Sequence, residues 1–212
     1  MTTESNYTLF HAHDPMCSWC WGFKKTWLTV FDSLGDNVTV RLLLGGLAPD
    51  SEVPMEDNMK SMLQSTWQRI EQSIPGTEFN HDFWTVNTPR RSTWPSCRAV
   101  IAARRQNEEF EAPMILAIQR AYYLEAKNPS DHDVLADIAQ SIGCDKSLFS
   151  AALNSESVHE EHVNERAFAA RIGAQGFPSL YLATPEQLVH PIHIDYNSPQ
   201  AILDQIDALI QG

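Results

Sequence analysis

The order of the predicted strands and helices limits the fold of this chain more than any other feature. Short apolar runs at residues 7–12 and 38–44 predict two strands, and the large apolar residues between them recur at helical spacing until Gly35 ends the helix. This β-α-β unit is followed by residues 54–173, which carry several amphipathic helix patterns and no convincing strand. The first two strands therefore cannot complete a sheet with the segment that follows them.

Strand character returns near the carboxyl terminus. Residues 179–183 and 189–194 flank a turn that contains proline, and an amphipathic helix follows them. Two strands alone are marginally stable, whereas three or four strands with a covering helix form a stable sheet. We therefore predict an α/β domain formed by residues 1–50 and 174–212, with residues 51–173 inserted as an all-helical domain.

Length and charge narrow the possible partners. The 212 residues suffice for one large domain or one domain with an insertion, and the formal net charge of −12 argues against nucleic acid or an anionic membrane as a partner. Residues 1–6 lack the basic and apolar segments of a secretory signal, and no run approaches the ~18 apolar residues of a membrane span. We therefore expect a cytoplasmic location. Nothing in the sequence predicts the oligomeric state.

Two cysteines mark the junction of the first strand and the first helix, in the motif C-S-W-C at residues 17–20. A C-x-x-C pair beside a strand–helix–strand pattern is typical of a thioredoxin-like redox site. The helix N-terminus favours a thiolate at Cys17, which would attack a disulfide, and Cys20 would resolve the mixed disulfide. The other interpretations are half of a zinc site, with His11 and His13 near in sequence, or two unreactive thiols. Because no second C-x-x-C follows, we expect no metal site.

The segment D-P-M-C-S-W-C-W-G-F at residues 14–23, the helical insertion and G-F-P-S at residues 176–179 together resemble the DsbA family of thioredoxin-fold proteins. The resemblance is closest to the cytoplasmic FrnE-like branch of predicted disulfide isomerases. It implies an α/β thioredoxin-like fold, β-α-β … β-β-α, with an inserted all-helical domain and a redox-active disulfide. It also implies that Pro178, at the position of the family's cis-proline, lies against the cysteines and shapes the substrate groove. Phe177 stands where Val or Thr is commoner in the family.

Several neighbours of the cysteines are candidates for binding or modulating the substrate. Ser18 and Trp19 leave the helix N–H groups free because neither is proline, and Trp19 would form an apolar lip or lie exposed between the cysteines. Asp14 has three interpretations: it damps the reactivity of the nearby thiol, accepts a proton from a leaving thiol, or forms the turn. Cys97 is interpreted as a buried structural cysteine, with a third redox thiol as the alternative.

These residues predict a thiol–disulfide oxidoreductase that acts on protein or small-molecule thiols and disulfides, with no tightly bound cofactor and with glutathione as a candidate co-substrate. The same superfamily implies an alternative, a glutathione-dependent isomerase or transferase related to 2-hydroxychromene-2-carboxylate isomerase or kappa-class glutathione transferase. Those relatives usually carry Ser at the position of Cys17. A second alternative is a non-catalytic binding module that keeps the fold. The direction of electron flow stays open because it depends on relative thiolate stabilities.

Overall fold

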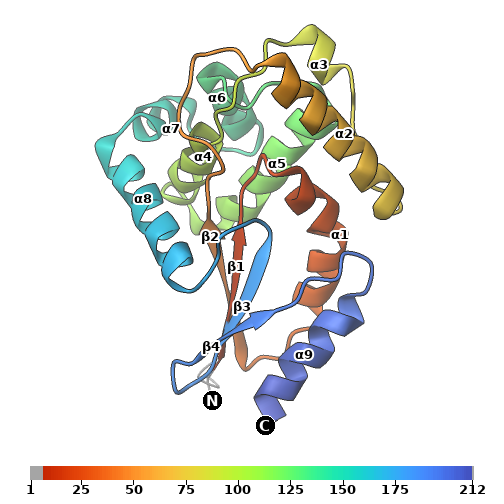
Figure 1. Ribbon diagram of the computed structural model, residues 1–212. Helices are drawn as coiled ribbons and strands as arrows, with labels where there is room; N and C mark the ends of the chain where they lie inside the picture. The colour runs from red at the N-terminus through yellow and green to blue at the C-terminus, as the bar shows by residue number, and fades with distance from the viewer. Residues whose placement is uncertain (1–6, 212) are drawn as a thin grey trace.

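The computed structural model describes residues 7–211 of the chain (Figure 1). Residues 1–6, predicted to lack a secretory signal, and Gly212, at the end of the predicted α/β domain, lie outside the described residues. No helix within residues 7–211 has the length and apolar character needed to cross a lipid bilayer.

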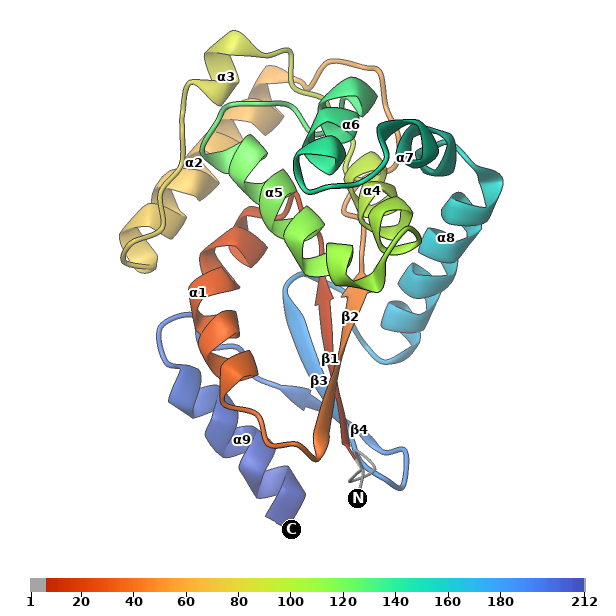
Figure 2. The ribbon, with the colours of Figure 1, turned by 180° about the vertical axis from the view of Figure 1, so that it is seen from behind.

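A four-stranded sheet lies at the centre of the fold (Figures 1 and 2). In the spatial order β2-β1-β3-β4, its strands are β2 (Val38–Leu44), β1 (Tyr7–His13), β3 (Ser179–Ala183) and β4 (Val189–Ile192). β1 runs parallel to β2, with His13 opposite Leu44, and antiparallel to β3, with Ala12 opposite Ser179. The residues that follow β1 are therefore held between an early and a late segment of the chain.

Helices cover both faces of the sheet (Figure 1). α1 (Ser18–Asp32) and α9 (Pro199–Gln211) pack on one face, and α8 (Glu156–Arg171) packs on the other. The alternation of side chains along β1 explains the two cores. Leu9 is buried in one cluster with Phe23 and Ile206, whereas Phe10 points to the opposite face, where its ring meets Phe168. Each fully buried large apolar side chain contributes roughly 1.5–3 kcal/mol.

The remaining helices form a block at the end of the sheet where β1 and β2 finish (Figure 2). They are α2 (Asp57–Ser73), α3 (Phe83–Val86), α4 (Trp94–Arg104), the 3₁₀ helix η1 (Glu108–Phe110), α5 (Glu111–Tyr123), α6 (His132–Ser141) and α7 (Lys146–Leu153). One core of the block surrounds α4, which is buried on nearly all sides. The other core is aromatic: Trp67 is fully buried between Phe79, at a ring distance of 4.7 Å, and Tyr123, at 5.5 Å.

The predicted fold class is confirmed, because β-α-β and β-β-α segments share one sheet and a run of helices separates them. The domain boundaries, 1–50 with 174–212 and 51–173, stay a prediction. α8 falls within the segment predicted as an insertion, yet it covers a face of the sheet. α3 and η1 were not predicted, because a helix of three or four residues is too short to show an apolar period.

A half-buried ion cluster ties the helical block to the sheet. The Arg104 guanidinium donates to Glu111 at 2.8 Å and to Glu161 at 2.6 Å, and it also pairs with Glu165. Glu165 accepts the backbone N–H of Leu44, the last residue of β2, at 2.9 Å. Burial alone would lower the pKa of Arg104, but the surrounding carboxylates raise it above its usual value. Helices α4, α5 and α8 and strand β2 therefore meet at one charge-compensated guanidinium.

Candidate active site

Cys17 lies where β1 gives way to α1. It is the N-cap residue of α1, with φ −83° and ψ 116°. Its backbone N–H donates to the carbonyl of Asp14 at 3.0 Å, and its own carbonyl accepts from the N–H of Trp21 at 3.0 Å. The first turn of a helix leaves N–H groups without helical partners, so the positive end of the α1 dipole lies at Cys17.

The Cys17 thiol faces a loop from the far end of the sequence. Its Sγ donates to the carbonyl oxygen of Phe177 at 3.3 Å, although the two residues are 160 positions apart. The Phe177–Pro178 peptide bond is cis, and β3 begins at the next residue. Because β3 pairs with β1, this loop lies beside the end of β1. The structure therefore brings together three predicted site residues, Cys17, Phe177 and Pro178.

Gly45 makes room for the Phe177 ring. A Cβ atom at Gly45 would lie only 1.9 Å from Cζ of Phe177. The N–H of Gly45 also donates to the carbonyl of His13 at 2.7 Å, so the end of β1 and the aromatic ring are both set by this residue. Sequence reasoning missed this role, because a glycine after a strand shows locally only that the strand ends.

Cys20 lies one turn after Cys17, on the buried side of α1, and both are free thiols. Burial raises the pKa of the Cys20 thiol, and the hydrogen-bonding contact with Cys17 and the negative charge of Asp14 act in the same direction. Cys20 is therefore a protonated thiol at neutral pH. The two cysteines are not equivalent: one faces the Phe177 loop at the helix end, and the other faces the interior.

The Asp14 carboxylate is fully buried and serves as a hub for three segments. It accepts hydrogen bonds of 2.7 Å each from the N–H of Met16, the N–H of Leu47 and the hydroxyl of Thr93. Burial raises the pKa of Asp14, and these hydrogen bonds oppose the rise. All the observed contacts of Asp14 are therefore those of a residue that organises the turn before Cys17. Its Thr93 and Leu47 partners were not predicted.

The two tryptophans around Cys20 have different environments. Trp19 is half-buried: its ring packs on Tyr196 at 5.2 Å, and the Arg69 guanidinium lies 5.4 Å from the ring centre. Trp21 is buried, and its ring stacks on Tyr123 at 5.6 Å. Trp19 therefore forms part of a wall with Tyr196 rather than projecting freely between the cysteines. Ser18, the first residue of α1, is buried.

The other cysteines lie in the interior. Cys97 is fully buried in the first turn of α4, and burial, with the charges of Asp14 and Glu165, raises the pKa of its thiol. Cys144 is also buried, and burial raises its pKa. Both environments suit structural cysteines. Within residues 7–211, no three His, Cys, Asp or Glu side chains gather in an arrangement that could hold a metal ion.

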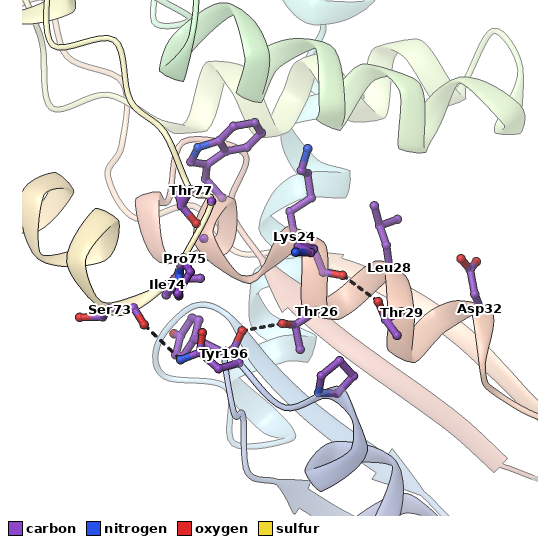
Figure 3. Close-up of a pocket in the computed structure, with 16 residues that line it drawn as sticks. Lys24, Thr26, Leu28, Thr29, Asp32, Ser73, Ile74, Pro75, Thr77 and Tyr196 are labelled. Carbon is purple, nitrogen blue, oxygen red and sulfur yellow. Dashed lines mark hydrogen bonds between the residues drawn. The ribbon is translucent and has the colours of Figure 1, made fainter.

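A groove of about 840 Å³ runs along the outer flank of α1 (Figure 3). Its walls come from α1, the segment after α2 and the loop before α9. Thr26 donates to the carbonyl of Tyr196 at 2.5 Å, and Asn197 donates to that of Ser73 at 3.1 Å, so the loop before α9 is fastened to both other walls. Lys24 rises from α1 toward the helical block and lines both this groove and a second cavity, which Cys20 also lines.

Comparison with known proteins agrees with this architecture. The model of a protein family described as Thioredoxin matches residues 10–195. The structure of a candidate protein disulfide isomerase from Nitrosomonas europaea superposes with a TM-score of 0.85, at 24% identity, over 97% of this chain and 98% of that chain. The cytosolic disulfide reductase DsbM from Pseudomonas aeruginosa superposes with a TM-score of 0.77, at 24% identity, over 96% of this chain and 98% of that chain. A second DsbM structure, with GSH, gives a TM-score of 0.76.

One curated relative is also similar in sequence. The ClpXP adapter protein SpxH of Bacillus subtilis is 23% identical over 168 residues, which is 79% of this chain. The match covers 55% of the length of SpxH, so a large part of that protein has no counterpart in the match.

Proposed function

The chain belongs to the Thioredoxin family, with a fold like that of DsbA proteins, and from this premise we propose that it is a thiol–disulfide oxidoreductase acting through Cys17 and Cys20. One observation carries the proposal. The Cys17 thiol lies at a helix N-terminus and contacts the Phe177 carbonyl beside Pro178, with Cys20 one turn behind it. This arrangement places the thiol of Cys17, a residue that is 6% exposed, against the loop at residues 177–178 and keeps the Cys20 thiol one helical turn away.

The reaction in the reducing direction follows from these positions. The Cys17 thiolate attacks one sulfur of a substrate disulfide, the substrate S–S bond breaks, and the leaving thiolate takes a proton from solvent. Cys20 then loses its proton and attacks the Cys17 sulfur, which forms the Cys17–Cys20 disulfide and releases the second substrate thiol. Two electrons pass to the substrate. Two glutathione molecules return them by the same exchange steps and leave as glutathione disulfide.

Two further features belong to the proposal. Glutathione as co-substrate is supported by the likeness to a DsbM structure with GSH, and a cytoplasmic location by the description of DsbM as cytosolic. Phe177 and Pro178 are proposed to line the substrate side of the site, and Trp19 to form its apolar edge. Asp14 is proposed to hold the turn that places Cys17.

Insulin reduction coupled to glutathione tests the reaction. We expect Cys17→Ser to abolish activity and Cys20→Ser to accumulate a mixed disulfide with glutathione that mass spectrometry detects, whereas Cys97→Ala keeps wild-type activity. Equal activity of wild type and Cys17→Ser would overturn the proposal. Activity that survives Cys20→Ser and saturates with glutathione would favour the isomerase or transferase alternative instead.

A redox titration of the Cys17–Cys20 pair against glutathione would show the direction of electron flow. A potential near about −270 mV is that of a reductant, and one near about −120 mV is that of an oxidant. Intrinsic fluorescence provides the signal, because Trp19 and Trp21 flank Cys20 in the sequence and lie on the same helix.

A binding module is the second candidate, and the similarity to a relative described as an adapter protein favours it. In this case the fold would serve to present a surface, and the thiols would not be needed. Affinity capture with the double variant Cys17→Ser/Cys20→Ser separates the two functions. Partners that this variant retains as well as wild type does would support the binding module, and partners held only through Cys17 would support the enzyme.

A further inference from the structure

A cavity of about 410 Å³ is lined by Cys20 but not by Cys17 or Phe177. Its lining residues come from α1, α5, β1 and β2, and Figure 2 shows how α1 and α5 lie relative to these strands. Most of its wall is apolar. Leu28 of α1 and Leu116 of α5, which are 51% and 40% exposed, form its mouth, while Trp27 and Leu42 lie deeper. A volume of this size is within the range of small-molecule sites.

Two buried imidazoles, with Lys24 and Gln119, supply the polar part of this wall. His11 and His13 are two residues apart on β1, so their side chains share one face of the sheet, the α1 side. Both line the cavity together with Cys20. Three ring nitrogens, Nδ1 and Nε2 of His11 and Nε2 of His13, have no hydrogen-bond partner among the described residues. A buried polar atom without a partner costs roughly 1–3 kcal/mol, so these nitrogens favour an occupant that bonds to them.

The chemistry of the wall selects the class of occupant. Burial lowers the pKa of both histidines, so each ring is neutral at pH 7 and offers one N–H donor and one bare nitrogen acceptor. A hydroxyl group can donate to one ring and accept from the other. The planar surfaces of Trp27 and the imidazoles fit a flat apolar body. Lys24 would repel a cationic ligand, and any fully charged ligand would lose its hydration in this mostly apolar wall.

We propose that the cavity between α1, α5 and the sheet is a binding site for a neutral aromatic alcohol of the phenol class, with His11 and His13 as its hydrogen-bonding partners. The ring system of the ligand would enter between Leu28 and Leu116 and stop against Cys20 and the imidazoles. The site is separate from the Phe177 loop, and its existence does not depend on the proposed redox function.

Equilibrium dialysis with 2-naphthol tests the site. We expect saturable binding at one site per chain, and naphthalene, which has the same rings without the hydroxyl, to bind about threefold to tenfold more weakly. Leu116→Arg places a cation in the mouth and should weaken 2-naphthol binding at least tenfold. Leu148→Arg is the matched control: Leu148 is 63% exposed on α7 and does not line the cavity, so this variant should bind as wild type does.

The hydrogen-bonding role has its own comparison. His13→Leu should bind naphthalene at least as well as wild type and lose the preference for 2-naphthol. If this variant does not fold, the comparison of 2-naphthol with naphthalene on the wild-type protein still tests the hydrogen-bonding role. Absence of saturable binding would mean that only water occupies the cavity, and equal affinity for the two ligands, or no effect of Leu116→Arg, would equally overturn the proposal.

Discussion

The hydroxyl of Thr93 donates a 2.7 Å hydrogen bond to the buried carboxylate of Asp14, which joins the start of α4 to the loop before α1. The same hydroxyl accepts the N–H of Ala48 at 3.1 Å. A chain of two hydrogen bonds therefore connects the segment after β2, the helical block and the turn that precedes Cys17. Hydrogen bonds to a charged acceptor are stronger than those to a neutral one, so this contact stabilises the turn that positions Cys17.

We predict that Thr93→Val lowers the free energy of unfolding by about 2–3 kcal/mol, because it leaves the N–H of Ala48 and one oxygen of Asp14 without this partner in the interior. Urea denaturation followed by circular dichroism measures the loss. Thr29→Val is the matched control, since the Thr29 hydroxyl bonds to a backbone carbonyl on the exposed face of α1. An equal effect of the two substitutions would contradict the buried role of Thr93.

Gly45→Ala is expected to reduce thiol–disulfide exchange at least tenfold. The added methyl group would overlap the Phe177 ring, so the loop that contacts the Cys17 thiol must move, and such overpacking costs typically about 1–3 kcal/mol. Gly176→Ala provides the control in the same loop, because a Cβ there meets no atom within 4 Å. Insulin reduction by the two variants gives the comparison, and comparable rates would show that the ring position does not matter.

Arg104→Ala should destabilise the fold by about 1.5–3 kcal/mol, because it leaves the carboxylates of Glu111 and Glu165 without their cation, whereas Glu161 keeps its pair with Arg105. Thermal and urea unfolding report the change. Lys146→Ala removes a cation whose pair with Asp137 is mostly exposed, and it should cost less than about 1 kcal/mol. Similar losses for both variants would argue against a structural role for the Arg104 cluster.

Acid should destabilise the protein through His13. Burial lowers its pKa from 6.5 to about 4. Between pH 6.5 and 4 the unfolded chain therefore binds more protons than the folded chain. The contribution of neutral His13 to the free energy of unfolding is complete above pH 6.5 and is lost as the pH falls toward 4. The expected loss is about 3 kcal/mol.

The measurement compares wild type with His13→Leu by urea denaturation at several pH values. The variant should show a smaller decline in stability between pH 6.5 and 4. Three other titratable residues line the same cavity and are present in both proteins: His11, Lys24 and Cys20. Asp14 is also present in both. Because its pKa is raised, it adds stability as the pH falls and so opposes the loss of stability caused by His13. Parallel curves for the two proteins would show that His13 does not titrate in this window.

The element order could be predicted because it depends on local patterns. Apolar periodicity placed β1, α1 and β2, and the return of strand character at residues 179–183 placed β3. Residue type alone does not show which side chain caps a helix. Thr93 and Asp131 stand before α4 and α6, yet neither side chain caps its helix. Both side chains bond to residues far away in the sequence instead: the Thr93 hydroxyl donates to Asp14, and Asp131 pairs with Arg90.

In the candidate site, too, the features carried by a local motif could be predicted, and the contacts between distant segments could not. The cysteines are visible as a local motif, and the nearness of the loop at residues 176–179 could be expected from the family resemblance alone. The partners of Asp14, the ring contact at Gly45 and the cavity lined by Cys20 join segments far apart in the chain, so no single window of sequence contains them. The chemical roles of Asp14, Ser18, Trp19, Phe177 and Pro178 stay predictions.

The distance of 160 residues between Cys17 and the carbonyl that it contacts has a consequence for biosynthesis. Ribosomes add about 5–20 residues per second, so the nascent chain carries both cysteines for roughly ten to thirty seconds before the Phe177 loop exists. During that interval β1 also lacks its neighbour β3. Newly made chains therefore pass through a period in which the Cys17 thiol lacks its contact with the Phe177 carbonyl, and the proposed redox site is among the last parts of the molecule to be completed.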